Sequence, residues 1–333
     1  MRKVAEAALS RYGLSGARLS FLQYEGNFVF RVDAPGTERR FEKKRRQPQR
    51  RYLLRIHTSP YKAGIESELT WLAALRHEGG VQVPEPVPTL EGMLLTSLSV
   101  QGDTREWHLS LMKWVSGRRL RKGLSAASAR AWGEALGRLH RFAATWRPPK
   151  GFTRMYLGWS GLYRQAGGLW YPAEELTALM PVRYREAFHI VTDEVRGVMD
   201  DLGEGPDVFG MVHGDMYLEN VLFKSGEARI IDFDDCGFGY WMYDIGVALS
   251  EWPWTPRWQR IRHALLEGYN AVHPLPASQL AHLDLFMAAQ YAVLTLWGTA
   301  FIKSNPGMRR EHEAWRNRGA EHLLRYLDLH KVG

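Results

Sequence analysis

The chain has 333 residues, of which 45% are hydrophobic, enough for two domains or one large two-lobed unit with a substantial core. One cysteine, Cys236, excludes an intramolecular disulfide, and the N-terminus lacks the apolar core and cleavage site of a signal peptide, so we expect a soluble cytoplasmic protein. The net charge of +8 is local, because residues 38–51 carry eight basic and two acidic side chains and the rest is nearly neutral.

The first third of the chain predicts an antiparallel sheet with one helix packed on it. Alternating apolar runs are separated by turn-forming residues such as Gly26-Asn27, which is typical of short strands joined by hairpins. Apolar residues at three- and four-residue spacing predict an amphipathic helix over 62–76, and a short helix is expected over 2–12. The predicted strands cover residues 18–33 in two parts, 52–57, 92–100 and 106–115.

From Ser116-Gly117 onward the sequence predicts a mainly helical region. Ser125 is a favourable N-cap for the first helix, whereas residues 148–182, rich in glycine, proline and aromatic residues, predict an irregular insertion. The apolar stretch Leu283–Phe301 is interrupted by polar residues and a glycine, so we expect a buried helix and not a membrane span. The predicted helices cover residues 125–142, 183–202, 256–270, 277–300 and 308–330, and another is opened by Tyr243-Asp244-Ile245-Gly246.

Residues 211–235 carry the pattern with the clearest chemistry. They predict a strand, a polar loop from His213 to Asn220, a hairpin, and a second strand that reaches Asp232. Because a hairpin returns its second strand beside the loop that began it, Asp215, Asn220 and Asp232 are expected to converge. Three oxygen-bearing side chains without a thiol or a second imidazole suit a hard cation such as Mg²⁺ and exclude a zinc-type site. The alternative is a polar hairpin whose Asp and Asn residues only cap turns.

The spacing H-x-D-x-x-x-x-N, followed by an apolar strand ending in D-F, resembles the catalytic and metal loops of protein-kinase-like phosphotransferases. The motifs HGD, IDFDD and YDIG resemble those of the aminoglycoside phosphotransferase and choline kinase branch of this fold. Within that branch, they are similar to the motifs of bacterial homoserine-kinase-like and stress-response kinases. The resemblance implies that Asp215 orients the acceptor hydroxyl and takes its proton, while Asn220 and Asp232 hold Mg²⁺. His213 is expected to fix the loop by a hydrogen bond, and Asp244 to support the loop or to cap its own helix.

The resemblance also implies a phosphate-binding cation in the N-terminal region. Arg55 stands on the third strand, where such a fold needs a cation for the α and β phosphates of ATP and usually has lysine. Glu68 lies on or beside the apolar stripe of helix 62–76, and a carboxylate there needs a cationic partner. We therefore expect an Arg55–Glu68 ion pair, against the alternatives of a surface arginine and an unrelated glutamate.

Two backbone segments are implied to complete the nucleotide site. Gly26 and Asn27 are expected in a loop that folds over the phosphates, because a glycine lets backbone N–H groups approach an anion. The alternative for this pair is an ordinary hairpin turn. Backbone groups around Met112 and Trp114, near the junction of the two lobes, are expected to bind the adenine edge.

The implied fold is α+β and bilobal, of the protein-kinase-like type. An N-terminal nucleotide-binding lobe over 1–115 would contain the antiparallel sheet and one helix, and a larger, mainly α-helical lobe over 116–333 would carry the catalytic and substrate-binding residues. The implied activity is ATP- and Mg²⁺-dependent transfer of the γ-phosphoryl group to a hydroxyl of a small molecule, such as an amino alcohol, a hydroxy amino acid or an aminoglycoside. The alternatives are a Ser/Thr protein kinase of the bacterial stress-response type and a non-catalytic nucleotide-binding pseudokinase. Nothing in the sequence selects the acceptor, ATP over GTP, or an oligomeric state.

The basic run 39–51 is interpreted as a solvated hairpin tip that charge keeps soluble. A docking patch for an acidic partner or nucleic acid is the alternative. Almost no aromatic residues are interleaved with these charges, which disfavours base stacking and therefore nucleic-acid binding.

Overall fold

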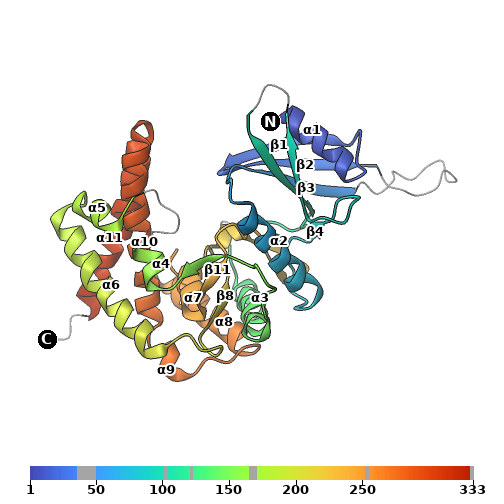
Figure 1. Cartoon of the computed structure of the whole chain (residues 1–333). Helices are drawn as coiled ribbons and strands as arrows, with labels where there is room; N and C mark the ends of the chain where they lie inside the picture. Colours follow the sequence, from blue (N-terminus) through green and yellow to red (C-terminus); the bar gives the residue numbers. More distant parts are fainter. Residues whose placement is uncertain (36–49, 101–103, 121–122, 165–170, 252–254, 331–333) are drawn as a thin grey trace. The chain divides into compact units, whose positions relative to one another are not determined.

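The computed structural model describes residues 1–35, 50–100, 104–120, 123–164, 171–251 and 255–330 (Figure 1). The chain forms two compact units. Unit 1 comprises Met1–Ser116 and Pro148–Thr153, and unit 2 comprises Gly117–Arg147 and Arg154–Gly333.

The short segment Pro148–Thr153 belongs to unit 1, although it lies in the range expected for the second domain. Its contacts explain this assignment. The amide of Thr153 donates to Ser67 Oγ at 2.9 Å, and the hydroxyls of Thr153 and Tyr61 share a hydrogen bond at 3.0 Å. The other boundary, between Ser116 and Gly117, lies one residue from the expected one.

Unit 1 is built on one antiparallel six-stranded sheet, in the order β1-β2-β3-β6-β4, with β5 also paired to β6. Short hairpins set the order of the first strands. Gly26, at φ +72°, makes the tight connection between β1 and β2, which is a conformation that glycine adopts without steric cost. The strands are β1 (Arg18–Glu25), β2 (Asn27–Ala34), β3 (Arg50–His57), β4 (Pro86–Val87), β5 (Leu95–Ser99) and β6 (Glu106–Lys113).

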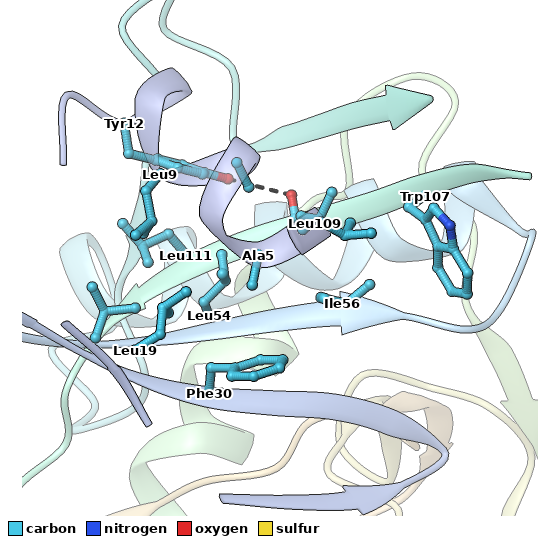
Figure 2. Packing of buried hydrophobic residues seen from close by; sticks show 13 residues of the cluster. Ala5, Leu9, Tyr12, Leu19, Phe30, Leu54, Ile56, Trp107, Leu109 and Leu111 are labelled. Carbon is cyan, nitrogen blue, oxygen red and sulfur yellow. Dashed lines mark hydrogen bonds between the residues drawn. The ribbon is translucent and has the colours of Figure 1, made fainter. Parts of the chain in front are cut away.

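Two helices accompany this sheet, α1 (Arg2–Arg11) and α2 (Lys62–His77), and the sequence predicted both of them, over 2–12 and 62–76. Figure 2 shows α1 lying over one sheet face, where its apolar side packs on buried leucines, isoleucine and phenylalanine of the strands. Tyr12, just past α1, donates its hydroxyl to the carbonyl of Leu109 at 3.3 Å. Because side chains alternate along a strand, residues such as Arg55 project from the opposite face.

Unit 2 is mainly helical, as expected from its sequence pattern. Ser125 caps its first helix by accepting a hydrogen bond from the amide of Ser128 at 3.1 Å. The helices are α3 (Ala126–Thr145), α4 (Trp159–Tyr163), α5 (Ala173–Ala178), α6 (Val182–Leu202), α7 (Trp241–Leu249), α8 (Pro256–Asn270), α9 (Ala277–Leu280), α10 (Leu283–Ser304) and α11 (Arg309–His330).

Two small sheets lie among these helices. β9 (Val221–Lys224) and β10 (Glu227–Ile230) form an antiparallel hairpin, whereas β7 (Met155–Leu157), β11 (Gly237–Tyr240) and β8 (Phe209–Val212) form a three-stranded sheet in the order β7-β11-β8. β7 and α4 fall inside the segment expected to be irregular. The second hairpin strand was expected to reach Asp232 but ends at Ile230.

α10 is the one helix in the described parts of the chain that is long and apolar enough to cross a membrane, and 78% of its apolar window is buried. It packs against α11, α7 and α6 (Figure 1). This burial makes it a core helix of unit 2, as its interrupted apolar pattern predicted.

Candidate active site

The β9–β10 hairpin brings Asn220 and Asp232 together. Its two turn residues, Ser225 and Gly226, have φ values of +53° and +83°, the backbone of a two-residue turn that matches the twist of a hairpin. The register pairs Val221 with Ile230, and the amide of the next residue, Ile231, donates to the Asn220 carbonyl at 2.9 Å. Asp232 therefore follows directly on the residue bonded to Asn220.

Asn220 also holds the predicted catalytic residue, Asp215. The Asn220 side-chain amide donates to the carboxylate Oδ2 of Asp215 at 2.7 Å and to the Asp215 carbonyl at 2.8 Å. Because both bonds use the amide nitrogen, the Asn220 Oδ1 atom is directed away from Asp215. That oxygen is the atom a cation would need.

Asp232 has φ +69°, a left-handed conformation that costs a residue with a Cβ about 1–2 kcal/mol. A residue in this conformation cannot continue a strand, which explains why β10 stops before it. Such local strain is characteristic of functional sites, where it sets the direction of a side chain. We name residues 231–236 the metal loop and residues 213–220 the catalytic loop.

The two loops touch through Gly214, which has φ +83°. A Cβ added at this position would overlap the carbonyl oxygen of Asp235 and lie 3.0 Å from Leu157 Cδ1. Only glycine therefore allows this approach of the catalytic loop to the metal loop.

His213 is a structural link between the loops and not a base. Its Nε2 donates to the Ile231 carbonyl at 3.0 Å, since a carbonyl can only accept, and its Nδ1 accepts the Asp215 amide at 3.2 Å. Burial lowers the pKa of His213, with the charge of Asp244 acting in the opposite direction. One neutral tautomer thus connects the two loops, as the sequence interpretation expected.

Asp244 supports the catalytic loop from α7. Its two carboxylate oxygens accept the amides of His213 and Gly214, each at 2.7 Å, and one also accepts His140 Nε2 at 3.1 Å. His140 Nδ1 is in turn hydrogen-bonded to the hydroxyl of Tyr269 at 2.8 Å. Of the two roles considered for Asp244, loop support is the one that its contacts show.

The site is rich in negative charge. Burial, and then the charges of Asp235 and Asp232, raise the pKa of Asp215 to about 8, whereas the Asn220 hydrogen bond acts in the opposite direction. Burial and the neighbouring Asp234 and Asp232 raise the pKa of Asp235 to about 6. Like charges this close repel one another, so the arrangement favours a bound cation.

The donor set fits a small hard cation. Mg²⁺ is commonly held by one or two carboxylates together with phosphate oxygens and water, and Asp232 with Asn220 Oδ1 supplies such a partial set. Among the described residues no group of three His, Cys, Asp or Glu side chains is arranged to hold a metal by itself. A cation here would therefore depend on oxygens from a bound ligand.

In unit 1 the expected ion pair is present. Arg55 Nη1 donates to Glu68 Oε1 at 2.9 Å, and both side chains are buried, with 8% and 3% of their surface exposed. A guanidinium carries five N–H donors in a planar fork, a geometry that matches phosphate oxygens. Its binding of phosphate stays a prediction.

Gly26 and Asn27, expected in a loop over the phosphates, lie in the turn between β1 and β2. Asn27 Oδ1 accepts the amide of Thr58 at 3.2 Å, and the Thr58 hydroxyl donates to the Gly26 carbonyl, so this pair forms a braced hairpin turn. Its role over phosphates stays a prediction.

The adenine contact of the backbone groups around Met112 and Trp114 stays a prediction, although one of these groups is already paired. The Trp114 amide donates to the Arg51 carbonyl at 3.1 Å, because the β3–β6 ladder continues past Lys113. This N–H is therefore not available to a base. Met112 lies within β6, paired with Leu53, and its side chain is buried.

The sequence interpretation missed Arg154 and Asp235. Arg154 lies in the segment expected to be irregular, and its guanidinium donates to carbonyls of the metal loop, including that of Cys236 at 2.7 Å. Nothing local in the sequence signals this contact. Asp235 was visible as the last residue of IDFDD, and its charge acts on Asp215.

The chain belongs to the phosphotransferase enzyme family, whose sequence model matches residues 30–279. A homoserine kinase of Rhizobium rhizogenes is 29% identical over 213 residues, which make up 61% of this chain and 59% of that protein. The aligned part thus spans less than two thirds of this relative's length.

Solved structures show the same fold. A microcompartment-associated aminopropanol kinase is 25% identical, with a TM-score of 0.74 and coverage of 99% of this chain and 98% of that one. An amicoumacin kinase in complex with AMP-PNP and Ca²⁺ is 19% identical, with a TM-score of 0.76 over 97% of this chain and 92% of that one. The predicted protein-kinase-like α+β fold and the resemblance to this family are confirmed.

Proposed function

We propose that this chain transfers the γ-phosphoryl group of ATP to a hydroxyl group of a small molecule, with Mg²⁺ as the metal ion. The observation that carries the proposal is the placement of Asn220 and Asp232 at the open end of the β9–β10 hairpin, with Asn220 bonded to Asp215 at 2.7 Å. Family membership supports phosphotransfer, and the AMP-PNP and Ca²⁺ bound to the amicoumacin kinase support a nucleotide and a divalent cation.

The three site residues of unit 2, Asp215, Asn220 and Asp232, each have a separate role in this proposal. Asp232 and Asn220 Oδ1 hold Mg²⁺, which when bound neutralises charge on the phosphates. Asp215 accepts a hydrogen bond from the acceptor hydroxyl, orients it, and takes its proton as the oxygen bonds to phosphorus. The Asn220 amide keeps the Asp215 carboxylate in a fixed direction, so that one oxygen faces the acceptor.

Unit 1 contributes the cation for the α and β phosphates. Arg55 suits this task because its planar fork matches phosphate oxygens, and Glu68 fixes the direction of that fork. Gly26 and Asn27 provide a short turn near the phosphates, and the adenine edge meets backbone groups around Met112 and Trp114.

The acceptor is proposed to be a small hydroxyl compound that carries an amino group. Homoserine and aminopropanol, the substrates named for two relatives, share this chemistry. A Ser/Thr protein kinase and a non-catalytic nucleotide-binding module are the alternatives that the experiment below separates.

The test is ATP consumption by the purified chain with Mg²⁺ and a panel of homoserine, aminopropanol, an aminoglycoside and a Ser/Thr peptide mixture. We expect turnover with a small amino-hydroxyl compound, and Asp215→Asn should lower it by about 10²- to 10⁴-fold while nucleotide binding persists. Asp201→Asn, at the exposed end of α6, is the matched control. Wild-type turnover by Asp215→Asn would refute the role of this residue, and nucleotide binding without transfer to any acceptor would favour the non-catalytic alternative.

A further inference from the structure

Arg154 is brought to the metal loop by strand pairing. β7 and β11 run parallel, and Met155 is in register with Gly237. Arg154 directly precedes β7, and Cys236 directly precedes β11. The ladder therefore sets Arg154 beside the end of the metal loop, although the two segments are about 80 residues apart in the sequence.

The guanidinium of Arg154 is hydrogen-bonded to three backbone carbonyls of this loop. Nε donates to the Cys236 carbonyl at 2.7 Å, and Nη2 donates to the Phe233 carbonyl at 3.4 Å and to that of Asp234. The Phe233 carbonyl also accepts the Cys236 amide within the loop at 3.1 Å, and the planar fork of Arg154 adds donors from outside the loop across residues 233–236. The contacts are to the backbone and therefore fix the shape of the loop.

The loop needs such support because of its conformation and its charge. It begins with Asp232 in a left-handed conformation and contains three carboxylates in four residues, Asp232, Asp234 and Asp235. Gly214 borders the loop at the Asp235 carbonyl. A displacement of the loop would therefore move the Asp232 carboxylate relative to Asn220 and Asp215.

We propose that Arg154 is a positioning residue for metal binding: by holding the carbonyls of residues 233, 234 and 236, it directs the Asp232 carboxylate toward the cation. The inference rests on the proposed function, because it takes Asp232 as a metal ligand. In this proposal Arg154 acts through the loop backbone and is not itself a metal ligand.

Charge and positioning make opposite predictions for Arg154. As a positive charge beside Asp235, it repels a divalent cation, so its removal should tighten metal binding if charge alone mattered. As a clamp on the backbone, its removal should weaken metal binding. Lysine keeps the charge but cannot reproduce the fork.

The experiment measures Mn²⁺ binding by electron paramagnetic resonance in the presence of AMP-PNP, with wild type, Arg154→Gln and Arg154→Lys. We expect both variants to bind Mn²⁺ about 10- to 100-fold more weakly, as when a residue that orients a metal ligand is removed. Arg262→Gln is the matched control, since Arg262 is also half-buried and pairs with Asp284 at 2.6 Å on α8 and α10. Its Mn²⁺ affinity should equal that of wild type.

The possible results distinguish a failure of the Arg154 proposal from a failure of the metal site itself. Unchanged or tighter Mn²⁺ binding by Arg154→Gln would overturn the proposal. If Arg154→Gln does not fold, the Lys variant decides: weaker binding with a near-normal unfolding midpoint supports the clamp, and normal binding overturns it. If wild type binds no Mn²⁺, or if an Asp232→Asn variant binds it as tightly as wild type, the metal site itself fails, and the clamp fails with it. Normal wild-type binding with unaffected Arg154 variants refutes the clamp alone.

Discussion

Gly214→Ala tests whether the contact between the catalytic and metal loops governs activity. Gly214 has φ +83°, and an added Cβ would overlap the Asp235 carbonyl oxygen and press on Leu157 at 3.0 Å. Gly226, in the β9–β10 turn, has the same φ of +83°, but nothing lies within 4 Å of its added Cβ. The two substitutions therefore share the backbone cost and differ only in the collision.

The shared cost is that of placing a Cβ in the left-handed region, about 1–2 kcal/mol. Gly226→Ala should lose only this amount of unfolding free energy. Its turnover should stay at the wild-type level, because the β9–β10 turn lies at the opposite end of the hairpin from Asp232. Gly214→Ala should lose a further ~1–3 kcal/mol of unfolding free energy, the usual cost of overpacking. The colliding atom is a backbone oxygen that cannot swing aside, because Arg154 holds the carbonyls on either side of it, those of residues 234 and 236.

The assay pairs urea unfolding with initial rates at a temperature well below both unfolding midpoints, so that lost activity does not reflect lost protein. We expect the rate of Gly214→Ala to fall by about 10²-fold, since a displacement near 1 Å in a positioning site costs that much. Equal stability and equal turnover of the two variants would refute the inference that the loops are packed against each other at this glycine.

Three further outcomes follow from buried polar groups. Asp244→Asn replaces one of two carboxylate oxygens that accept backbone amides with an NH₂ group, which can only donate. We therefore expect urea unfolding to show a loss of about 3–5 kcal/mol in the free energy of unfolding. The control, Asp284→Asn at a half-exposed ion pair, should lose under about 1 kcal/mol. Glu68→Gln leaves the buried Arg55 without its carboxylate, and should raise the KM for ATP more than that for the acceptor in initial-rate measurements. Burial, and then the charge of Arg55, lower the pKa of His57 well below 6.5, so below pH 6.5 only the unfolded chain takes up this proton. The free energy of unfolding should therefore decrease as the pH is lowered, by up to about 1.4 kcal/mol per pH unit. His57→Gln should flatten this slope between pH 7 and 5 in urea titrations.

Much of the fold was predictable where one pattern spans a whole element. The amphipathic period over 62–76 predicted α2, which runs from Lys62 to His77, and the alternating strands predicted the antiparallel sheet. The convergence of Asn220 and Asp232 followed from hairpin geometry alone, because pairing of consecutive strands is local. The Arg55–Glu68 pair followed from the cost of burying a lone carboxylate.

The remaining features depend on partners far away in the sequence. The three-residue β7 carries no periodic signal, so neither its parallel pairing with β11 nor the contact of Arg154 could be predicted. The early end of β10 depends on the φ of Asp232, and although aspartate adopts the left-handed conformation more often than most residues, the sequence does not show which aspartate will do so. Likewise the Trp114 amide is occupied because the β3–β6 ladder extends to Arg51, which depends on strand register.

The backbone of the site is held by three side chains with complementary hydrogen-bonding capacities. The Asp244 carboxylate can only accept, and it binds two amides of the catalytic loop; the Arg154 guanidinium can only donate, and it binds carbonyls of the metal loop. His213 must do both, donating to Ile231 and accepting from Asp215, which only a neutral imidazole can do. Burial lowers the pKa of His213 and so favours this neutral form, whereas a proton on Nδ1 would oppose the Asp215 amide. Since phosphoryl transfer depends mainly on positioning and charge neutralisation, we expect these supports to affect the rate through the positions of the two loops.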